Sequence, residues 1–561
     1  MQIKKLLCLL LSALLLVSLL AGCGGSSASS GASDSAASGS ASSSGAASGT
    51  TGGITANEGV AAAAAVEAST AQSDRIMQLG SYQGSSSLDP INGYDYWYML
   101  RYGVCETLMK FGPDMSPTPW LAADMPTVSE DGLTWTVVIR DDVTFSNGEK
   151  LTAEKAKAAI ERNYGAIATA KGAFSLREFT ADGQTLTISL EAPAPLMPYL
   201  LADPAFVIYD TADLTDVADK GPIGTGPFVF SAFDVVSMDT SVVRNENYWG
   251  GEVMCAGIDF HIITDPSTLN FALQNGELDG AYGIDVEYIT NYMNDPAFIA
   301  QITSSTRTDF GFMNQNEGSV LADETLRQAV IRICDRATYC SALLYDIYIP
   351  GITPLTSALP YGYNELNDIN AYDVESAVAL LDAAGYKDAD GDGVRDMPDG
   401  SELVIRITSY NRPEIPLLAN ALWMAGADIG LNFKIEETDS GTAWNKLVAG
   451  DYDICFMSIA MATSGDPAGQ MRNYFHSEGA YNKCGYANAE VDAIFDELSG
   501  TSDVSRRIEL IMQMEQLIMD DSVAIYFCYP TLNFVTTADV AGVTSHVSDY
   551  YWVSAATGFS D

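Results

Sequence analysis

Residues 222–228 read PIGTGPF, and this segment decides how the middle of the chain folds. Gly224 and Gly226, followed by Pro227, predict a constrained turn, because glycine adopts backbone angles that other residues resist. The turn leads into a predicted strand from Phe228 to Phe230. A phosphate-binding glycine loop would instead lead into a helix. The segment is therefore interpreted as a structural turn at the start of a strand.

A second segment, residues 244–250, reads RNENYWG. Its two large aromatic side chains, Tyr248 and Trp249, contribute mostly apolar area when they are buried. They are predicted to pack between elements of structure, with contact to a ligand as the alternative. Like the first segment, this one is interpreted as scaffold.

Short strands alternate with helices along the chain, which indicates a mixed α/β class. Thr152 is predicted to cap a helix from Ala153 to Asn163, because its hydroxyl can accept a bond from an N–H of the first turn. Asp265 and Pro266 predict a second helix start, and Gly276 the end of that helix. Further predicted elements are strands at 133–139, 258–264 and 403–407, and a helix that Asp373 caps and that Gly385 follows.

Size and charge narrow the class of protein. Residues 74–561 exceed the size at which one hydrophobic core keeps growing, which predicts two or more lobes. The chain carries 73 acidic and 28 basic side chains, a formal charge of −45. This charge disfavours nucleic acid and anionic lipid as partners, because both are negatively charged. It permits a cationic ligand.

The cysteines do not form a recognisable pattern. Seven remain once Cys8 and Cys23 are set aside, an odd number that contains no CxxC pair. No disulfide framework is therefore predicted. Cys334 and Cys455 lie inside apolar runs, so we expect buried structural thiols at these positions.

The N-terminus has the pattern of a secretion signal. Lys4 and Lys5 precede an apolar run from Leu6 to Val17 that only Ser12 interrupts. The run ends near Leu20 and is shorter than the roughly 20 residues that a membrane-spanning helix needs. We therefore expect residues 1–22 to be removed and the mature protein not to span a membrane.

Residues 20–23, Leu-Ala-Gly-Cys, resemble a bacterial lipobox, in which the cysteine receives a diacylglycerol. Cys23 would then anchor the protein by its acyl chains to a membrane surface. The alternative is an ordinary secretion signal with an incidental cysteine. Residues 23–73 are almost entirely serine, glycine, alanine and threonine, which predicts a disordered tether because too little apolar area offsets the entropy of ordering it.

Further motifs occur in an order and spacing that resemble a known family. They are WLA at 120–122, DGLTW at 131–135, FSNGE at 145–149, TAE at 152–154, LRQA at 326–329, AGY at 384–386 and the segment 486–492. With the two segments quoted first, they resemble the family 5 extracellular solute-binding proteins. These are the oligopeptide-, dipeptide- and nickel-binding subunits of ABC importers. The resemblance covers nearly the whole mature chain.

The resemblance implies a fold and its boundaries. The implied fold is a two-lobed α/β protein of the periplasmic-binding-protein class II, cluster C, with an extra subdomain in the first lobe. The lobes would close over a ligand at a hinge that two strands cross. The implied ranges are 74–112 for the first segment of lobe I, 113–222 for the extra subdomain, 223–315 for the second segment of lobe I, 316–530 for lobe II and 531–561 for a return to lobe I.

The resemblance also implies partners and a location. The partners are the permease and ATPase subunits of an ABC importer and a small ligand, with no nucleic acid and no required cofactor. A monomer is expected, held by its lipid anchor on the extracytoplasmic face of the cell membrane. The membrane would be contacted through that lipid alone.

Within the family, the nickel-binding type is the nearest likeness. Residues 471–476 match the spacing at which that type places a ligand-site histidine. His476 would supply a neutral imidazole to Ni²⁺ or a metal chelate, or pair with a carboxylate when protonated. The alternative is an exposed loop histidine, because no second histidine or cysteine lies at ligand spacing.

Other positions depart from both ligand types. Residues 200–209 contain Asp203 and no basic residue, where the nickel type has an arginine that holds the carboxylates of its chelator. The aromatic clamp of that type is matched loosely by Tyr94, Trp97 and Tyr98. Peptide-binding members hold the ligand's amino terminus with an aspartate where this chain has Thr463. The expected ligand is a short peptide or a metal chelate, and the two stay open.

The same region offers charged candidates of its own. Asp466 could accept a cationic group, and Arg472 or Arg412 could bind a carboxylate through charge-assisted hydrogen bonds. The alternative for each is a solvated loop residue, which is the usual state of a charged side chain.

A separate loop has several features of a calcium site. Asp388, Asp390, Asp392 and Asp396 stand at first, third, fifth and ninth positions, with a glycine at the sixth. Asp399 stands where an EF-hand has a bidentate glutamate, and a predicted strand follows in place of a second helix. We weigh a structural Ca²⁺ site against a glycine- and aspartate-rich turn.

The sequence gives little support to an enzyme. It contains no HExxH motif, no GxSxG elbow after a strand and no P-loop, and its three histidines are scattered. A secreted hydrolase is therefore disfavoured. A ligand-sensing or adhesive surface lipoprotein on the same fold is the stronger alternative, because fold alone does not fix function.

Overall fold

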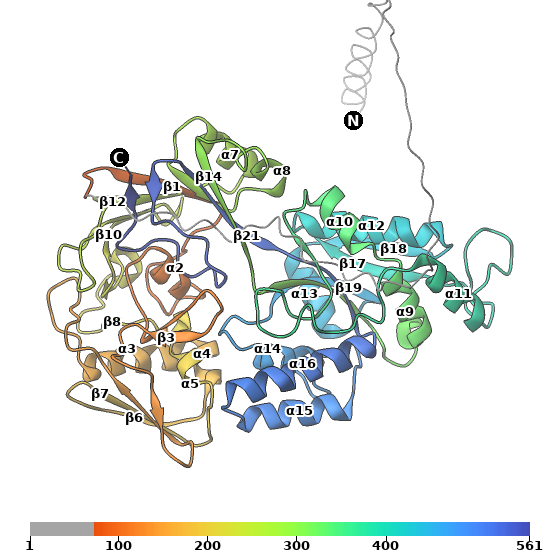
Figure 1. Cartoon of the computed structure of the whole chain (residues 1–561), viewed down its shortest axis with the longest axis horizontal. Coiled ribbons are helices and arrows are strands. Elements are labelled where there is room, and N and C mark those ends of the chain that lie inside the picture. Colours follow the sequence, from red (N-terminus) through yellow and green to blue (C-terminus); the bar gives the residue numbers. More distant parts are fainter. Residues whose placement is uncertain (1–71, 561) are drawn as a thin grey trace, which may run out of the picture. The chain divides into compact units, whose positions relative to one another are not determined.

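The computed structural model describes residues 72–560 of the chain (Figure 1). The predicted signal peptide 1–22, Cys23 and the predicted tether 23–73, apart from its last two residues, lie outside the described residues. Ser73 donates its N–H to Met254 O over 2.7 Å, so the fold already includes the end of that tether. Among residues 72–560, every helix is too short or too polar to cross a lipid bilayer.

The first lobe is built on a seven-stranded sheet with the strand order β10-β11-β12-β1-β13-β21-β14. Its strands come from the beginning, the middle and the end of the described chain. They are β1 (Ile76–Ser81), β10 (Phe228–Phe233), β11 (Thr240–Arg244), β12 (Gly257–Ile262), β13 (Gly280–Tyr282), β14 (Phe298–Ser304) and β21 (Thr531–Thr537). The strand β1 runs parallel to β12 and β13, and the other pairs are antiparallel. The helices of this lobe are α2 (Tyr96–Arg101), α7 (Pro266–Gln274) and α8 (Val286–Ile289).

A smaller unit with its own sheet is inserted between β1 and β10. Its four strands have the order β4-β5-β7-β6 and span β4 (Thr127–Val128), β5 (Thr134–Val138), β6 (Leu176–Asp182) and β7 (Thr185–Leu190). Its helices are α3 (Ala153–Ala166), α4 (Ala168–Ala173), α5 (Met197–Leu200), η1 (Pro204–Phe206) and α6 (Val217–Lys220). Two short strand pairs flank it, β2 (Met109–Phe111) with β3 (Pro117–Pro119), and β8 (Tyr209–Asp210) with β9 (Ile223–Gly224).

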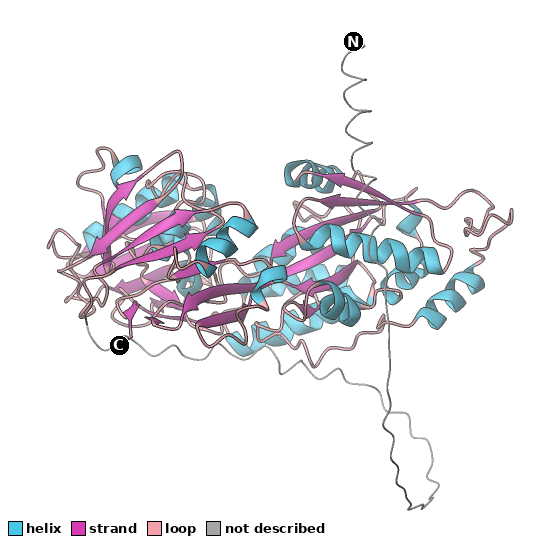
Figure 2. Cartoon of the chain, turned by 90° about the horizontal axis from the view of Figure 1, so that it is seen from above, coloured by secondary structure: helices cyan, strands magenta, loops and turns pink. Residues whose placement is uncertain are grey.

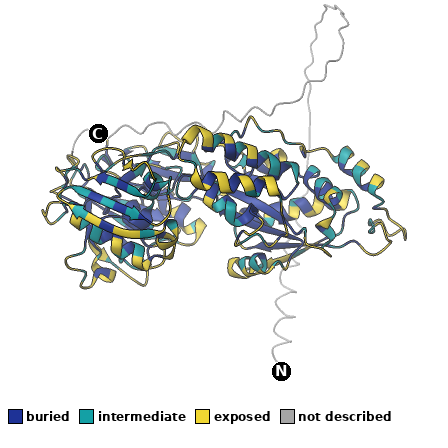
Figure 3. Cartoon of the chain, turned by 90° about the horizontal axis from the view of Figure 1, so that it is seen from below, coloured by how far each residue is buried: buried dark blue, intermediate teal, exposed yellow. Residues whose placement is uncertain are grey.

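The second lobe is built on a six-stranded mixed sheet with the order β16-β20-β15-β19-β17-β18. Its strands are β15 (Arg307–Met313), β16 (Ile349–Pro350), β17 (Ile405–Tyr410), β18 (Phe433–Thr438), β19 (Ile454–Ala460) and β20 (Ala524–Tyr529). Its helices are η2 (Val320–Ala322), α9 (Glu324–Arg332), α10 (Arg336–Leu343), α11 (Val374–Ala384), α12 (Glu414–Asp428), α13 (Ser440–Ala449), α14 (Ala468–Phe475), α15 (Ala489–Gly500) and α16 (Val504–Asp520). Helices flank these strands (Figure 2), and the strands are mostly buried while the helices carry the exposed faces (Figure 3).

Two segments of chain connect the sheets of the two lobes. Ser305 and Thr306 join β14 to β15, and Pro530 joins β20 to β21, which can be followed between the lobes in Figure 1. The Ser305 hydroxyl donates to Pro530 O, so the two crossing segments are bonded to each other. Thr356 Oγ1 donates to Ser305 O over 2.7 Å. The resemblance implied two crossing strands, and this connection has that form.

The predicted helix caps are confirmed. Thr152 accepts a bond from Lys155 N, and Asp265 accepts one from Thr268 N over 2.8 Å. Asp373 caps α11 in the same way, and Gly385 ends it with a left-handed φ of 92°. The third predicted strand begins two residues later than expected, at Ile405, because the pairing of β17 with β18 starts at that residue.

The PIGTGPF segment forms the predicted turn, but its glycines are needed for a different reason. Neither Gly224 nor Gly226 has a positive φ. A Cβ on Gly224 would lie 2.0 Å from Val104 O, and one on Gly226 would lie 2.3 Å from Gly103 O. The backbone of this turn passes directly against the backbone of residues 103–104, and only glycine leaves room for that approach.

The RNENYWG segment packs as predicted, and it also satisfies a buried carboxylate. Tyr248 Oη donates to Glu106 Oε1 over 2.9 Å, and Trp249 Nε1 donates to Glu106 Oε2 over 2.8 Å. Glu106 is 1% exposed, and burial raises its pKa to about 7 although these hydrogen bonds lower it. Asn245 Nδ2 donates to Gly226 O, which links this segment to the glycine turn. Both quoted segments are therefore scaffold.

Candidate ligand-binding site

A cavity of about 1380 Å³ is lined by residues from both lobes and from the inserted unit. The first lobe contributes residues of α2 and of the segment around 550, and the inserted unit contributes α4, α5 and η1. The second lobe contributes the start of β15, the end of β19 and the helices α14 to α16. Its volume exceeds the roughly 300–1,000 Å³ of ordinary small-molecule pockets.

Aromatic side chains form one wall of the cavity. Tyr94, in the turn that precedes α2, and Trp97, the second residue of that helix, have ring centroids 6.0 Å apart. Trp97 also contacts Tyr550 edge-on at 5.2 Å. Tyr98 does not line the cavity; it is 8% exposed and lies against the guanidinium of Arg101. Two of the three predicted clamp residues are thus brought together at the cavity.

Thr463 lines the cavity from the second lobe, in the loop between β19 and α14. Its backbone carbonyl accepts a 2.7 Å hydrogen bond from Tyr550 Oη. Because Tyr550 belongs to the C-terminal segment of the first lobe and Thr463 to the second lobe, this bond joins the two walls of the cavity.

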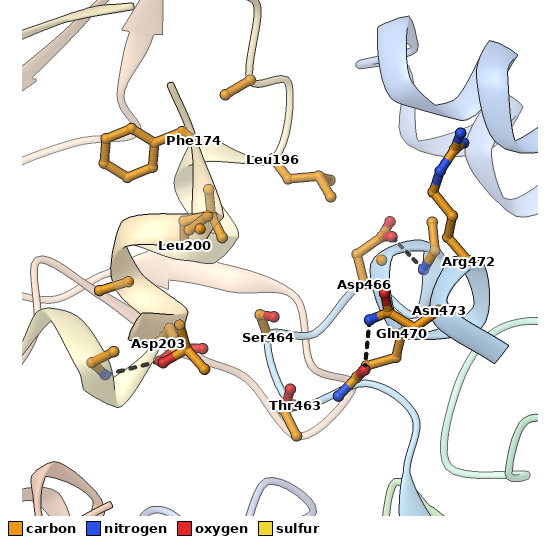
Figure 4. Close-up of a pocket in the computed structure, with 18 of the residues that line it drawn as sticks. Phe174, Leu196, Leu200, Asp203, Thr463, Ser464, Asp466, Gln470, Arg472 and Asn473 are labelled. Carbon is orange, nitrogen blue, oxygen red and sulfur yellow. Dashed lines mark hydrogen bonds between the residues drawn. The ribbon is translucent and has the colours of Figure 1, made fainter. Parts of the chain in front are cut away.

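Asp466 also lines the cavity (Figure 4), but it already forms an ion pair with Arg507. Arg507 donates through Nε to Asp466 Oδ2 and through Nη2 to Oδ1, each over 2.8 Å. Both side chains are 5% exposed. Asp466 Oδ1 accepts a further bond from Ala468 N, at the start of α14. This paired, bidentate geometry leaves little capacity for a cationic ligand group.

Arg472 lines the cavity and His476 lies behind it. Arg472 pairs with Asp496 at 3.2 Å, and its Nη2 lies 3.1 Å from His476 Nε2. His476 is 6% exposed, does not line the cavity, and accepts a bond from Glu478 N at Nδ1. It is neither an exposed loop residue nor a cavity group. A metal ion at Nε2 would lie beside a guanidinium, which is electrostatically unfavourable.

Arg412 lies after β17 and does not line the cavity. It pairs with Glu414, a carboxylate that is 3% exposed. The nearby Asp309 is fully buried, and burial followed by the charge of Glu414 raises its pKa to about 7. Arg412 therefore belongs to a buried cluster of charged side chains in the second lobe.

The Asp-rich loop gathers three of the five predicted calcium ligands. Carboxylate oxygens of Asp388, Asp390 and Asp392 lie within 4.8 Å of one another, and all three residues are exposed. Asp396 instead accepts a bond from Ala389 N, and Asp399 accepts two from Ser401. A calcium site here stays a prediction.

Most of the residues that line the cavity were not among the candidates derived from the sequence, and the charged residues Arg307 and Asp203 are two of them. Arg307 is the first residue of β15, and Asp203 precedes η1 in the inserted unit. Asp203 stood out in the sequence only as a departure from the nickel-binding type. Arg307 has no local signal at all, because its position depends on where β15 leaves the crossing segment.

The family model of the bacterial extracellular solute-binding proteins, family 5 Middle, matches residues 116–482 of this chain. The chain belongs to this family. The motif resemblance and the two-lobed α/β class that it implied are therefore confirmed.

Similar proteins match most of the chain. The nickel-binding periplasmic protein of Escherichia coli (strain K12) is 25% identical over 472 residues, which cover 78% of this chain and 86% of the relative. The oligopeptide-binding protein OppA of Mycobacterium tuberculosis (strain ATCC 25618 / H37Rv) is 23% identical over 428 residues, covering 72% and 71%. The crystal structure of a nickel ABC transporter protein from Bacillus halodurans has a TM-score of 0.75 at 26% identity, covering 86% of this chain and 100% of that one.

Proposed function

We propose that this family 5 protein is the solute-binding subunit of an ABC importer, anchored by lipid at Cys23 on the extracytoplasmic face of the membrane. It captures a short peptide or a nickel or other metal chelate by closure of its two lobes. It then delivers the solute to the permease, and the ATPase subunit supplies the energy. The protein acts as a monomer and needs no cofactor for capture.

One observation carries this proposal: the cavity is lined by both lobes, and only two bonded crossing segments connect the sheets of those lobes in the described part of the chain. A ligand in such a cavity touches both walls, so its binding favours the arrangement in which the walls are close. The names of similar proteins, which specify nickel and oligopeptides, agree with a solute-binding role.

The dimensions of the cavity favour a ligand larger than a bare ion. Its volume of about 1380 Å³ and the aromatic wall of Tyr94, Trp97 and Tyr550 offer apolar contact to an organic molecule. A free metal ion would use neither feature. Both a short peptide and a metal chelate would use both.

The test is thermal unfolding of the mature chain, made without its signal peptide and with Cys23→Ala. The ligands are a panel of di- to pentapeptides, and Ni²⁺ alone and with L-histidine. A ligand that binds only the folded state at about 100 times its Kd adds about 2.7 kcal/mol, which raises Tm by about 3 °C for a chain of this size. Trp97→Ala should remove most of that rise, whereas Trp423→Ala, on an exposed face outside the cavity, should not.

The pattern of responses separates the two ligand classes. A rise with the nickel chelate that Trp97→Ala abolishes would establish the chelate, and a rise with peptides alone would reject it. No rise with any member of the panel would contradict the proposal.

The anchor at Cys23 has a test of its own. When the full-length chain is produced in a bacterial host, the protein should sediment with membranes and incorporate labelled fatty acid. Cys23→Ser should release it into the soluble fraction. Equal membrane association of the two proteins would reject the lipid anchor.

A further inference from the structure

The charges that line the cavity are not all used within the protein. Four of them form two pairs, Asp466 with Arg507 and Arg472 with Asp496. Three remain, Lys171, Asp203 and Arg307, and within residues 72–560 none of them has an opposite charge at ion-pairing distance. Lys171 is exposed to water. Asp203 and Arg307 are the ones that the fold partly removes from water.

Arg307 presents a guanidinium with spare donors to the cavity. A guanidinium has five N–H groups, and the side chain of Arg307 donates one hydrogen bond to the described part of the chain, from Nη1 to Ser458 O over 2.8 Å. Burial, followed by the neighbouring charge of Arg412, lowers its pKa. Asp309, two residues along β15, is fully buried and bonded to the Cys528 thiol. A desolvated cation in this state is stabilised by a carboxylate that arrives from outside.

Asp203 is the complementary group on the other wall. Its Oδ1 accepts one bond, from Ala205 N over 2.8 Å, and its second oxygen has no hydrogen-bond donor among the described residues. The titratable groups that face it are Tyr96, Tyr550 and Tyr551, whose pKa values burial raises, so they stay neutral. Burial also raises the pKa of Asp203 to about 6.

The two groups belong to different walls of one cavity. Figure 4 shows Asp203 on the side of the inserted unit, facing the loop that carries Thr463 and Ser464. Arg307 comes from the second lobe, next to the crossing segment at Ser305 and Thr306. Each wall therefore supplies one half-buried charge without an ionic partner in residues 72–560, and the two charges have opposite sign.

We propose that the ligand is dipolar, with a carboxylate bound by Arg307 and a cationic nitrogen bound by Asp203. This inference rests on the proposed function of solute capture and names the chemistry of the solute. Since each anchor sits on a different wall, a dipolar ligand is held by both, and it neutralises both charges only when the walls are close. The aromatic wall of Trp97 and Tyr94 then covers the part of the ligand between its two charges.

The test of the first anchor uses isothermal titration calorimetry and the tightest-binding peptide of the panel. That peptide is compared with its C-terminal amide on the wild-type protein, Arg307→Gln and the control Arg177→Gln. Arg177 is an exposed arginine of β6 outside the cavity, so its variant removes the same charge elsewhere. Amidation should weaken wild-type binding by about 10- to 100-fold, about as much as Arg307→Gln does. In Arg307→Gln, acid and amide should bind within about twofold of each other.

The second anchor is tested in the same way with the N-acetylated peptide. Acetylation should weaken binding to the wild type by about tenfold or more, and Asp203→Asn should remove the difference. Asp213→Asn, at an exposed position outside the cavity, should behave as the wild type. Ligand-free Tm values of all variants check that each one is folded.

The outcomes distinguish this inference from the function on which it rests. Wild-type protein that binds acid, amide and acetylated peptide alike would overturn the dipolar ligand and leave solute capture standing. The same holds if only the nickel chelate binds and both variants bind it normally. Wild-type protein that binds no member of the panel would overturn the proposed function, and this inference with it.

Discussion

Glu106 and Asp203 are two carboxyls that burial perturbs in the same direction, to pKa values of about 7 and about 6. Glu106 receives the Tyr248 hydroxyl and the Trp249 indole N–H, so both of its oxygens are bonded. Asp203 receives one backbone N–H and faces the cavity. The difference shows that a raised pKa alone does not mark a functional site. What distinguishes the two is whether the protein itself supplies the partner.

The largest expected effect tests how rigid the surroundings of Glu106 are. Gly226→Ala places a methyl group 2.3 Å from Gly103 O, a backbone atom that cannot move aside. We expect a loss of about 3 kcal/mol or more in the free energy of unfolding, measured by urea denaturation. The control is Gly165→Ala in α3, where nothing lies within 4 Å, and it should gain about 0.5–1 kcal/mol. A wild-type unfolding midpoint for Gly226→Ala would show that this scaffold is loose.

The second prediction isolates the charge of Glu106. Its folded pKa of about 7 lies above the ordinary value of 4.5, so between these values the native state binds more protons than the unfolded state. Stability from this group is therefore highest at low pH and falls as pH rises toward 7. Glu106→Gln lacks this dependence, so relative to the wild type it should gain up to about 3 kcal/mol between pH 5 and pH 8. The free energy of unfolding of each protein is measured by urea denaturation at several pH values. If it changed with pH by the same amount in both proteins, the assignment would be contradicted.

The third prediction concerns Asp203, the carboxyl whose proposed partner is the ligand. Asp203 should lose its charge below about pH 6, and the tyrosines that face it, Tyr96, Tyr550 and Tyr551, do not titrate in that range. Affinity for a peptide without histidine should therefore fall by about tenfold from pH 7 to pH 5. Calorimetry on Asp203→Asn should show weaker binding, with an affinity that does not change between pH 7 and pH 5. A wild-type affinity that does not change with pH would place the cationic group of the ligand elsewhere.

The smallest expected effect concerns the three exposed carboxylates of the Asp-rich loop. If the exposed oxygens of Asp388, Asp390 and Asp392 hold Ca²⁺, millimolar Ca²⁺ should raise Tm by about 1–2 °C. EDTA should reverse the rise, and the double variant Asp388→Asn with Asp392→Asn should not respond. Asp213→Asn serves as the control for removal of an exposed charge. An identical Tm with Ca²⁺ and with EDTA would reject the calcium site and favour the aspartate-rich turn.

The scaffold could be predicted from the sequence because its signals are local. The caps at Thr152, Asp265 and Asp373 follow from one side chain and the N–H groups of the next turn. The family could be predicted because its motifs keep their order. The physical reason for Gly224 and Gly226 could not, since it depends on the backbone at 103–104, more than a hundred residues earlier in the chain.

The cavity was only partly predictable, for the same reason. Tyr94, Trp97, Thr463, Asp466 and Arg472 do line it. Their partners decide what they can do, and those partners are distant in sequence. Arg507 lies 41 residues beyond Asp466 and neutralises it. The sequence shows Arg307 as one basic residue among 28, and only the tertiary structure shows that the described part of the cavity wall leaves its guanidinium without a carboxylate.

The strand β21 has a consequence for the order in which this protein is made. It lies between β13 and β14 in the sheet of the first lobe, although it follows the whole second lobe in sequence. A nascent chain emerges from its N-terminus, so the first lobe begins first and is completed last. Until residues 531–537 arrive, the facing edges of β13 and β14 have no strand between them. Loss of the last thirty or so residues would therefore damage the lobe that contains the start of the described chain and leave the sheet of the second lobe with all of its strands.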